Sequence, residues 1–285
     1  MFAPLVTKDP TLIQVEVQSA YTTICPNADL MFVPRVFGWV TECFIGKYKD
    51  YQAIDAKYHD FEHTMQGTLC MARLLRGRHL ANANPALNQR VFQLGLLAIL
   101  FHDTGYLKKN DDIEGTGAKY TATHVTRSME FAEHFLREKN FSAGDIKSIQ
   151  NMIQCTGVDA VLSTIPFQSE QEKIVGHALG TADLIGQMAA DDYVDKLPIL
   201  YAEFAEADAY HEKENSYFAT FSSAQDLMLK TPAFWEKYVL PKLTKEFSGV
   251  YRFLSDPFPF GPNEYLLRIE ENIKKLRQRV SVASK

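Results

Sequence analysis

Apolar residues recur at three- and four-residue spacing along most of this chain, which is the periodicity of amphipathic α-helices. The clearest stripe lies between Asp60 and Arg78 and consists of Phe61, Met65, Leu69, Ala72 and Leu75. Further helices are expected over residues 30–48, 86–101, 120–139, 141–152, 169–188, 197–209, 224–229, 234–253 and 264–280. Residues 11–24 alternate in a way that fits either a strand or a helix. Because no strand-rich block, repeat or low-complexity segment is present, the chain is predicted to be all-α, a compact multi-helix bundle.

The length of the chain bears on its domain organisation. Its 285 residues are enough to bury a full core, and we expect one large helical domain rather than two smaller ones. This domain is expected to comprise residues 30–260, preceded by a lead segment of residues 1–29 and followed by a C-terminal helix in residues 261–285. Prolines, among them Pro232 and Pro241, are expected to punctuate the helices of the last third.

Composition and charge are those of an ordinary soluble globular protein, with 46% hydrophobic and 23% charged residues. The net charge of −5 and the lack of a basic run argue against a polymeric nucleic acid as the main partner. No run of about 18 apolar residues occurs, so no membrane-spanning segment and no membrane partner are expected. The dispersed cysteines indicate buried thiols in a reducing cytosol, and we expect a cytoplasmic protein. They are Cys25, Cys43, Cys70 and Cys155.

A continuous apolar run, residues 96–101, ends abruptly in His102 and Asp103. The run is too apolar for a surface helix, so we expect Asp103 near the carboxyl end of a buried helix. At that position, both desolvation and the helix dipole disfavour a charged carboxylate. A bound cation would compensate both effects. Taken alone, the pair also fits a solvated turn that follows a hydrogen-bonded core histidine. The metal interpretation depends on partners elsewhere in the chain.

Three other stretches carry candidate ligands for such a metal. His59 and His63 are four residues apart, so they share one face if the helix already includes Tyr58. His124 falls near the first turn of another expected helix, where it faces either a loop-lined cavity or water. Asp183 lies inside an apolar stretch, where a carboxylate is unfavourable unless it is paired or metal-bound.

Four motifs in a fixed order carry a resemblance to a known superfamily. They are Tyr58-His59-Asp60-Phe61-Glu62-His63, Phe101-His102-Asp103-Thr104-Gly105, His124, and Ala182-Asp183-Leu184. In these motifs the chain resembles the HD superfamily of metal-dependent phosphohydrolases, and within it the catalytic domain of class I cyclic-nucleotide phosphodiesterases. The resemblance spans roughly residues 30–253 and implies a helical bundle of the HD-domain type.

The resemblance also implies a catalytic metal site. One divalent metal would be held by four residues, His63, His102, Asp103 and Asp183. Two imidazoles and two carboxylates suit zinc, manganese, iron or nickel better than calcium. In the family, Asp103's counterpart bridges to a second, largely water-held metal, often magnesium or manganese, and His124 matches a histidine near that metal's waters or the phosphate. His59 matches the histidine that protonates the departing alkoxide. A hydroxide that bridges the two metals in the family would attack phosphorus.

Two departures from the family pattern bear on the substrate. Asp60 stands where the family has asparagine, which would alter how His59 is oriented or make the site more acidic. Residues 234–241 resemble the helix that follows the purine-clasping glutamine, yet the expected position holds Thr231. Gln225 is the nearest glutamine and would need a shifted alignment. The candidate substrate-binding residues are therefore Tyr58, Thr231 and Gln225.

The expected activity is hydrolysis of a phosphoester bond in a small nucleotide, with a cyclic nucleotide as the favoured substrate. A nucleotidase or nucleoside triphosphate phosphohydrolase with the same site is the alternative within the superfamily. A non-catalytic helical module that senses a nucleotide is the alternative outside the enzymes.

Overall fold

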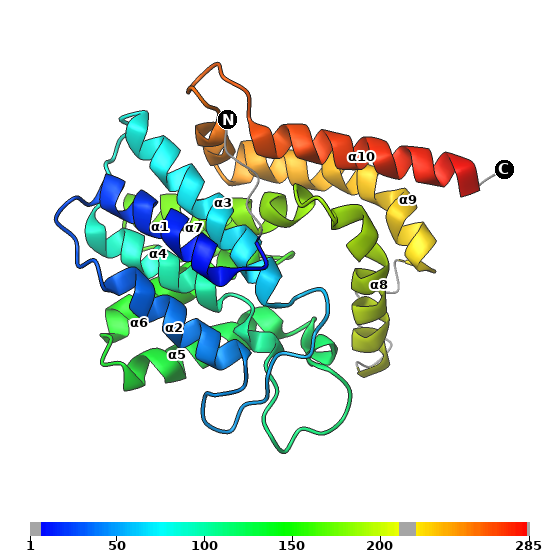
Figure 1. The fold of residues 1–285 in the computed structure, drawn as a ribbon, viewed down its shortest axis with the longest axis horizontal. Helices are drawn as coiled ribbons and strands as arrows, with labels where there is room; N and C mark the ends of the chain where they lie inside the picture. Colours follow the sequence, from blue (N-terminus) through cyan, green and yellow to red (C-terminus); the bar gives the residue numbers. More distant parts are fainter. Residues whose placement is uncertain (1–6, 211–220, 284–285) are drawn as a thin grey trace.

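The computed structural model describes residues 7–210 and 221–283, and in these ranges the chain forms ten α-helices and no strand (Figure 1). The predicted all-α fold is therefore confirmed. Residues 1–6 of the expected lead segment and residues 284–285 at the other end lie outside the described residues. The helices are α1 (Pro10–Ile24), α2 (Phe32–Phe44), α3 (Phe61–Leu80), α4 (Gln89–Phe101), α5 (His124–Glu138), α6 (Ala143–Ile153), α7 (Glu170–Met188), α8 (Tyr193–Tyr210), α9 (Ala224–Phe234) and α10 (Glu264–Ala283).

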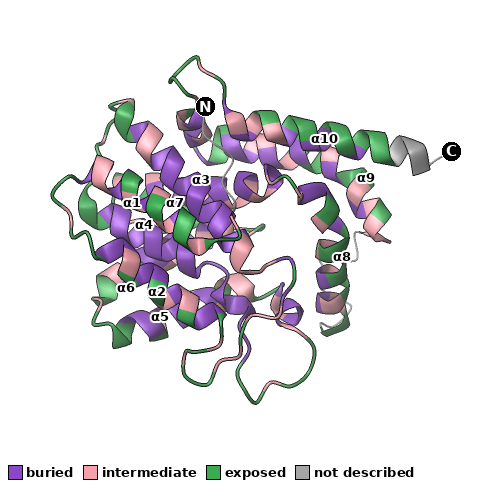
Figure 2. Ribbon diagram, in the orientation of Figure 1, coloured by how far each residue is buried: buried purple, intermediate pink, exposed green. Residues whose placement is uncertain are grey.

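Helices α3 and α7 pack against each other at the centre of the bundle, with α4 and α6 beside them. Figure 2 shows that buried residues dominate these central helices. The apolar run of α4 lies in the core, since every residue from Val91 to Phe101 is buried. Helix α4 ends at Phe101 with His102 as its C-cap, so Asp103 directly follows a buried helix, as expected from the sequence.

The first and last helices complete the same core. Residues 11–24, which fitted either a strand or a helix, belong to α1, because Asp9 caps its first turn and Pro10 occupies the first helical position. Helix α1 packs on α3, while α10 packs on α9 and α7. Ile13 of α1 and Ile273 of α10 are both buried in one continuous apolar cluster. The core therefore extends from the first described helix to the last.

The chain around Pro232 differs from the expected pattern. This proline lies inside α9 instead of ending a helix, and the chain continues through two π-helical segments, Trp235–Val239 and Lys242–Glu246. A proline removes one backbone donor, and the wider π turn is one way in which a helix accommodates the change. The helix boundary predicted between residues 229 and 234 was therefore wrong.

The cysteines follow the prediction, because all four are buried and free. Burial raises the pKa of the Cys43 and Cys155 thiols to about 12, so both stay neutral in the core. No helix within the described ranges combines the length and the apolar character needed to cross a bilayer.

The N-cap of α3 is Asp60. Its carboxylate accepts a hydrogen bond of 2.8 Å from the backbone N–H of His63, which fixes the turn that carries this histidine. Replacing Asp60 by alanine is expected to lower the free energy of unfolding by about 1 kcal/mol, whereas asparagine retains the cap. Chemical denaturation of both variants measures the difference. An alanine variant as stable as the wild-type protein would refute the capping role.

Candidate metal centre

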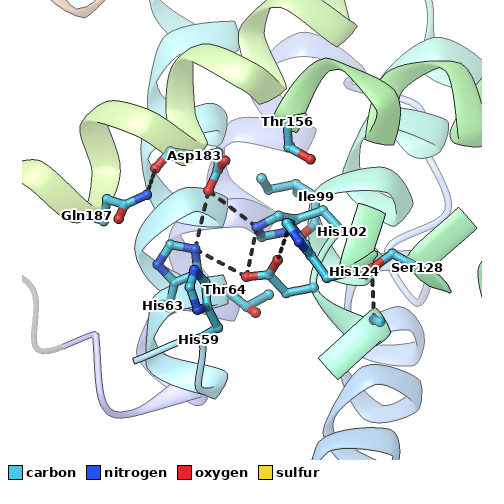
Figure 3. Close-up of polar contacts among 12 residues, drawn as sticks. His59, His63, Thr64, Ile99, His102, His124, Ser128, Thr156, Asp183 and Gln187 are labelled. Atoms are coloured by element: carbon cyan, nitrogen blue, oxygen red, sulfur yellow. Dashed lines mark hydrogen bonds and ion pairs between the residues drawn. The ribbon is translucent and has the colours of Figure 1, made fainter. Parts of the chain in front are cut away.

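Four side chains from the central helices converge on one point (Figure 3). His63 lies in the first turn of α3, and Asp183 lies in the second half of α7. His102 and Asp103 directly follow α4. His63, His102 and Asp103 are buried, and the side chain of Asp183 is 13% exposed. The structure thus brings together the four residues predicted as metal ligands, and we call this set the metal centre.

The donor atoms of the metal centre alternate around a closed ring. His63 Nε2 lies 3.2 Å from both Asp103 Oδ2 and Asp183 Oδ1. His102 Nε2 lies 3.3 Å and 3.4 Å from the same two oxygens. Ligands at about 2.1 Å from one ion are roughly 3 Å apart when adjacent, so these spacings suit a shared divalent cation.

Two atoms of this ring have ion-pair contacts but no hydrogen bond within the described part of the chain. His102 Nε2 and Asp103 Oδ2 are buried, and neither forms a hydrogen bond of acceptable geometry. A buried polar atom without a partner is unfavourable by about 1–3 kcal/mol. A cation at the centre of the ring would satisfy both atoms, which supports a metal site over a structural ion-pair cluster.

Hydrogen bonds fix which nitrogen of each imidazole faces the metal centre. His102 Nδ1 lies 2.7 Å from the carbonyl oxygen of Ile99, and a carbonyl can only accept, so Nδ1 carries the proton. His124 Nδ1 donates in the same way to the carbonyl of Thr121 at 2.6 Å. The Nε2 atoms of both rings are therefore left to face the carboxylates. His124 Nε2 lies 3.9 Å from Asp103 Oδ1, at the edge of the ring of ligands.

The titration of these groups reflects their mutual charges. Burial disfavours the charged form of His63, but the negative carboxylates of Asp103 and Asp183, each 3.2 Å from its Nε2, outweigh burial and raise the pKa of His63 to about 9. The two imidazoles likewise hold the pKa of both carboxyls below the usual range, against the opposing effect of burial. Burial lowers the pKa of His124, so this ring is neutral at pH 7. Without a cation, the positive charge of the protonated imidazoles compensates the negative charge of the two carboxylates. A bound cation would replace those protons.

His59 lies beside the metal centre and precedes α3, which begins at Phe61. The condition that the helix already includes Tyr58 is therefore not met, although the rings of His59 and His63 are only 5.3 Å apart. His59 Nδ1 lies 2.6 Å from Glu203 Oε2, and the carboxylate accepts this hydrogen bond. Because Nδ1 is bound to Glu203, Nε2 is the nitrogen left for chemistry.

Glu203 of α8 is a residue of the candidate site that the sequence analysis missed. Its side chain is 5% exposed, and its Oε1 accepts hydrogen bonds of 2.7 Å from the backbone N–H groups of Lys57 and Tyr58. Glu203 therefore fixes both the ring of His59 and the backbone before it. A signal was available, because Glu203 lies on the buried stripe of α8, where an acid is unfavourable without a partner.

Tyr106 is a second residue that the sequence analysis missed. Its ring is fully buried and lies between two imidazoles. The ring of His59 stacks on it at 4.5 Å between centroids, and that of His124 stacks at 4.9 Å. Tyr106 thus fixes the separation of two histidines that both border the metal centre.

The candidate substrate-binding residues are placed less favourably. Tyr58 is buried beside His59, and its hydroxyl donates a hydrogen bond of 2.6 Å to Gln187. Thr231 is buried, and its hydroxyl donates to the carbonyl of Leu227 at 2.8 Å, while Gln225 is exposed in the first turn of α9. Neither Thr231 nor Gln225 has a hydrogen bond or ion pair to the metal centre in the described structure.

Comparison with known proteins places the chain in a family. A family model matches residues 15–112 and 110–250, which is most of the chain. The chain belongs to the Npun_R2479-like family. The first matched range contains three residues of the metal centre and the second contains Asp183, so the Npun_R2479-like region includes the whole site. No curated protein matches the chain. The description of the Npun_R2479-like family names no activity, so the chemistry is argued from the geometry of the site.

Proposed function

We propose that this protein is a metal-dependent phosphohydrolase of the HD type, acting on a small phosphorylated substrate. The observation that carries the proposal is the ring of two imidazoles and two carboxylates in which buried His102 Nε2 and Asp103 Oδ2 lack hydrogen bonds. A second observation supports catalysis over a purely structural metal. His59, held by Glu203, lies against this ring and carries a nitrogen that is free to exchange a proton.

The four residues of the metal centre would hold one divalent ion, of which zinc, manganese, iron and nickel fit the donor set. Asp103 Oδ1 faces His124 instead of the ring, so it would contribute to a second ion, magnesium or manganese. When bound, such ions supply a water of lowered pKa and polarise the phosphoryl oxygens.

The remaining residues have roles that follow from their own contacts. Glu203 orients His59 and stabilises the imidazolium, so that Nε2 can donate a proton to the departing oxygen of the ester. Tyr106 stacks on both His59 and His124 and keeps these rings from rotating. His124, neutral at pH 7, would contact the phosphate or a metal-bound water.

The favoured substrate is a cyclic nucleotide. The second candidate activity is that of a nucleotidase or nucleoside triphosphate phosphohydrolase, and the contacts of Thr231 support it. In the phosphodiesterase-like reading, Thr231 stands at the position of the base-clasping glutamine. Its buried hydroxyl is already bonded to the carbonyl of Leu227, so it does not replace that amide. A substrate held mainly through its phosphate is therefore compatible with this chain. The four buried thiols fit a reducing compartment, and we propose a cytoplasmic location.

A substrate panel tests the proposal. Purified protein with added manganese is expected to release p-nitrophenol from bis-p-nitrophenyl phosphate. Cyclic AMP and cyclic GMP, tested with AMP and deoxynucleoside triphosphates, separate the two candidate activities. Cleavage of AMP or of the triphosphates with the cyclic nucleotides untouched selects the nucleotidase or triphosphate phosphohydrolase. Tight nucleotide binding without turnover under every metal tested would overturn the enzymatic proposal in favour of a sensor.

A further inference from the structure

Arg127 of α5 has an unusual set of partners. Its Nε donates a hydrogen bond of 2.7 Å to the carbonyl oxygen of Gly105, and its Nη2 donates one of 2.9 Å to the carbonyl oxygen of Leu107. The guanidinium carbon lies 3.4 Å from the centroid of the Tyr120 ring, which is a cation–π contact. No acidic side chain pairs with Arg127 in the described ranges of the chain. Its charge is therefore directed at a backbone segment and a ring.

The segment that Arg127 holds carries Tyr106, since the two carbonyls belong to the residues on either side of it. A guanidinium donates its hydrogen bonds in one plane, so it fixes the orientation of both peptide groups at once. Ser128, the next residue of α5, accepts a hydrogen bond of 2.8 Å from the backbone N–H of Gly105 (Figure 3). Helix α5 thus binds the backbone around Tyr106 at three points.

Two glycines show how closely the chain packs around Tyr106. A Cβ atom on Gly105 would overlap the carbonyl oxygen of His124, and one on Gly117 would overlap the carbonyl oxygen of Tyr106. Only a residue without a side chain allows such approaches of one backbone to another. The contacts of Arg127 therefore act on a segment that cannot shift without moving the first turn of α5 or the chain at Gly117.

The ring of Tyr106 transmits this position to the candidate site. It stacks on His59 with the two planes 10° apart and on His124 with the planes 23° apart. His124 belongs to α5, as Arg127 does, whereas His59 comes from the loop before α3. Glu203 holds His59 at Nδ1, and a single hydrogen bond does not stop a ring from turning about it. The face of Tyr106 supplies the second constraint on the direction of His59 Nε2.

We propose that Arg127 is a positioning residue that sets the direction of the His59 ring through Tyr106. The kinetic consequence rests on the proposed function, whereas the geometric one holds whether or not His59 transfers a proton. Arg127 has no hydrogen bond or ion pair with a residue of the metal centre in the described structure, so its loss leaves the metal ligands in place. What changes is the angle at which His59 meets the departing oxygen of a substrate.

Histidine NMR tests the geometry without any turnover. The full chain, labelled at histidine and kept in EDTA, is compared with Arg127→Met, which keeps a long unbranched side chain. The ring protons of His59 lie against the face of Tyr106, whose ring current moves their signals upfield. These signals are expected to lose most of the upfield shift in Arg127→Met. Tyr106→Leu defines their position without the aromatic ring, and His59→Asn assigns them.

Steady-state kinetics test the consequence, on the nucleotide that the substrate panel selects. Arg127→Met is expected to lower kcat by about tenfold with the metal bound and KM within about twofold, because a misdirected proton donor slows the reaction without weakening binding. In a His59→Asn background the same change should lower kcat no further, since both changes remove one function. A residue that only stabilises the fold would lower kcat by the same factor in both backgrounds.

Arg137→Met is the matched control. Arg137 also lies in α5 and also donates through Nε and Nη2, but both hydrogen bonds go to Glu133 at an exposed position. Neither the histidine signals nor kcat should change in this variant.

Two results would overturn the proposal. They are unchanged His59 signals in Arg127→Met, and a further loss of kcat when Arg127→Met is added to His59→Asn. If Arg127→Met does not fold, Arg127→Gln takes its place, because glutamine is too short to reach both carbonyls. If the wild-type protein cleaves no nucleotide, the proposed function fails, and the NMR comparison still decides whether Arg127 positions His59.

Discussion

Replacing Asp103 with asparagine is expected to abolish the manganese-dependent hydrolysis of bis-p-nitrophenyl phosphate. Asp103 Oδ2 faces both imidazoles of the metal centre, and Oδ1 lies 3.9 Å from His124 Nε2, so this one carboxylate faces three histidines. Asparagine keeps the shape of the side chain but removes its charge. We therefore expect the affinity for the metal to fall by more than about a hundredfold. Mutation of residues that only hydrogen-bond to metal ligands already lowers metal affinity by about 10–100-fold.

Metal content and release of p-nitrophenol, measured on the same samples, check this expectation. Asp145→Asn is the matched control, because Asp145 lies in the first turn of α6 and is paired with Arg90 at a partly exposed position. This variant is expected to retain its metal and its activity within about twofold. Equal rates for Asp103→Asn and the wild-type protein would rule out the proposed chemistry.

Replacing His59 with asparagine is expected to lower kcat by about a hundredfold or more while the metal stays bound. His59 is not a ligand of the ring, and its proposed role is to protonate the departing oxygen. That role predicts a dependence on the leaving group. p-Nitrophenolate leaves readily without a proton, whereas the alkoxide of a ribose does not. The loss should therefore be smaller on bis-p-nitrophenyl phosphate than on the nucleotide that the protein hydrolyses.

Glu203→Gln tests the charge that His59 faces. Glutamine has one acceptor oxygen, so it can accept from His59 Nδ1 only if its NH2 group turns toward the backbone N–H groups of Lys57 and Tyr58. It also no longer stabilises an imidazolium, so its effect should follow that of His59→Asn in direction and be smaller. Steady-state kinetics on both substrates, together with metal analysis, measure the two variants. If His59→Asn slows both substrates to the same extent, His59 is not the proton donor.

Much of this site could be predicted from sequence because its signals are local. The apolar run of α4 ends at His102 and Asp103, and the burial of that helix follows from its composition alone. Asp183 is conspicuous for the same reason, as a carboxylate within an apolar stretch of α7. In each case, a charged side chain in an apolar segment is unfavourable without a compensating group, so the sequence alone predicts a partner for it.

The parts that could not be predicted depend on contacts between segments distant in sequence. Glu203 and His59 are separated by 144 residues, and their hydrogen bond requires α8 to pack against the loop before α3. The stacking of Tyr106 depends on the positions of two histidines from different segments. Helix propensity also gave no reason for α9 to continue through Pro232. Periodicity locates helices, but it does not determine which faces meet.

A crystal of the protein grown with manganese, measured at a wavelength where manganese scatters anomalously, tests the central claim most directly. We predict an anomalous peak about 2.0–2.3 Å from donor atoms of His63, His102, Asp103 and Asp183. A peak only at another site, or these four side chains hydrogen-bonded to one another with no peak between them, would contradict the account.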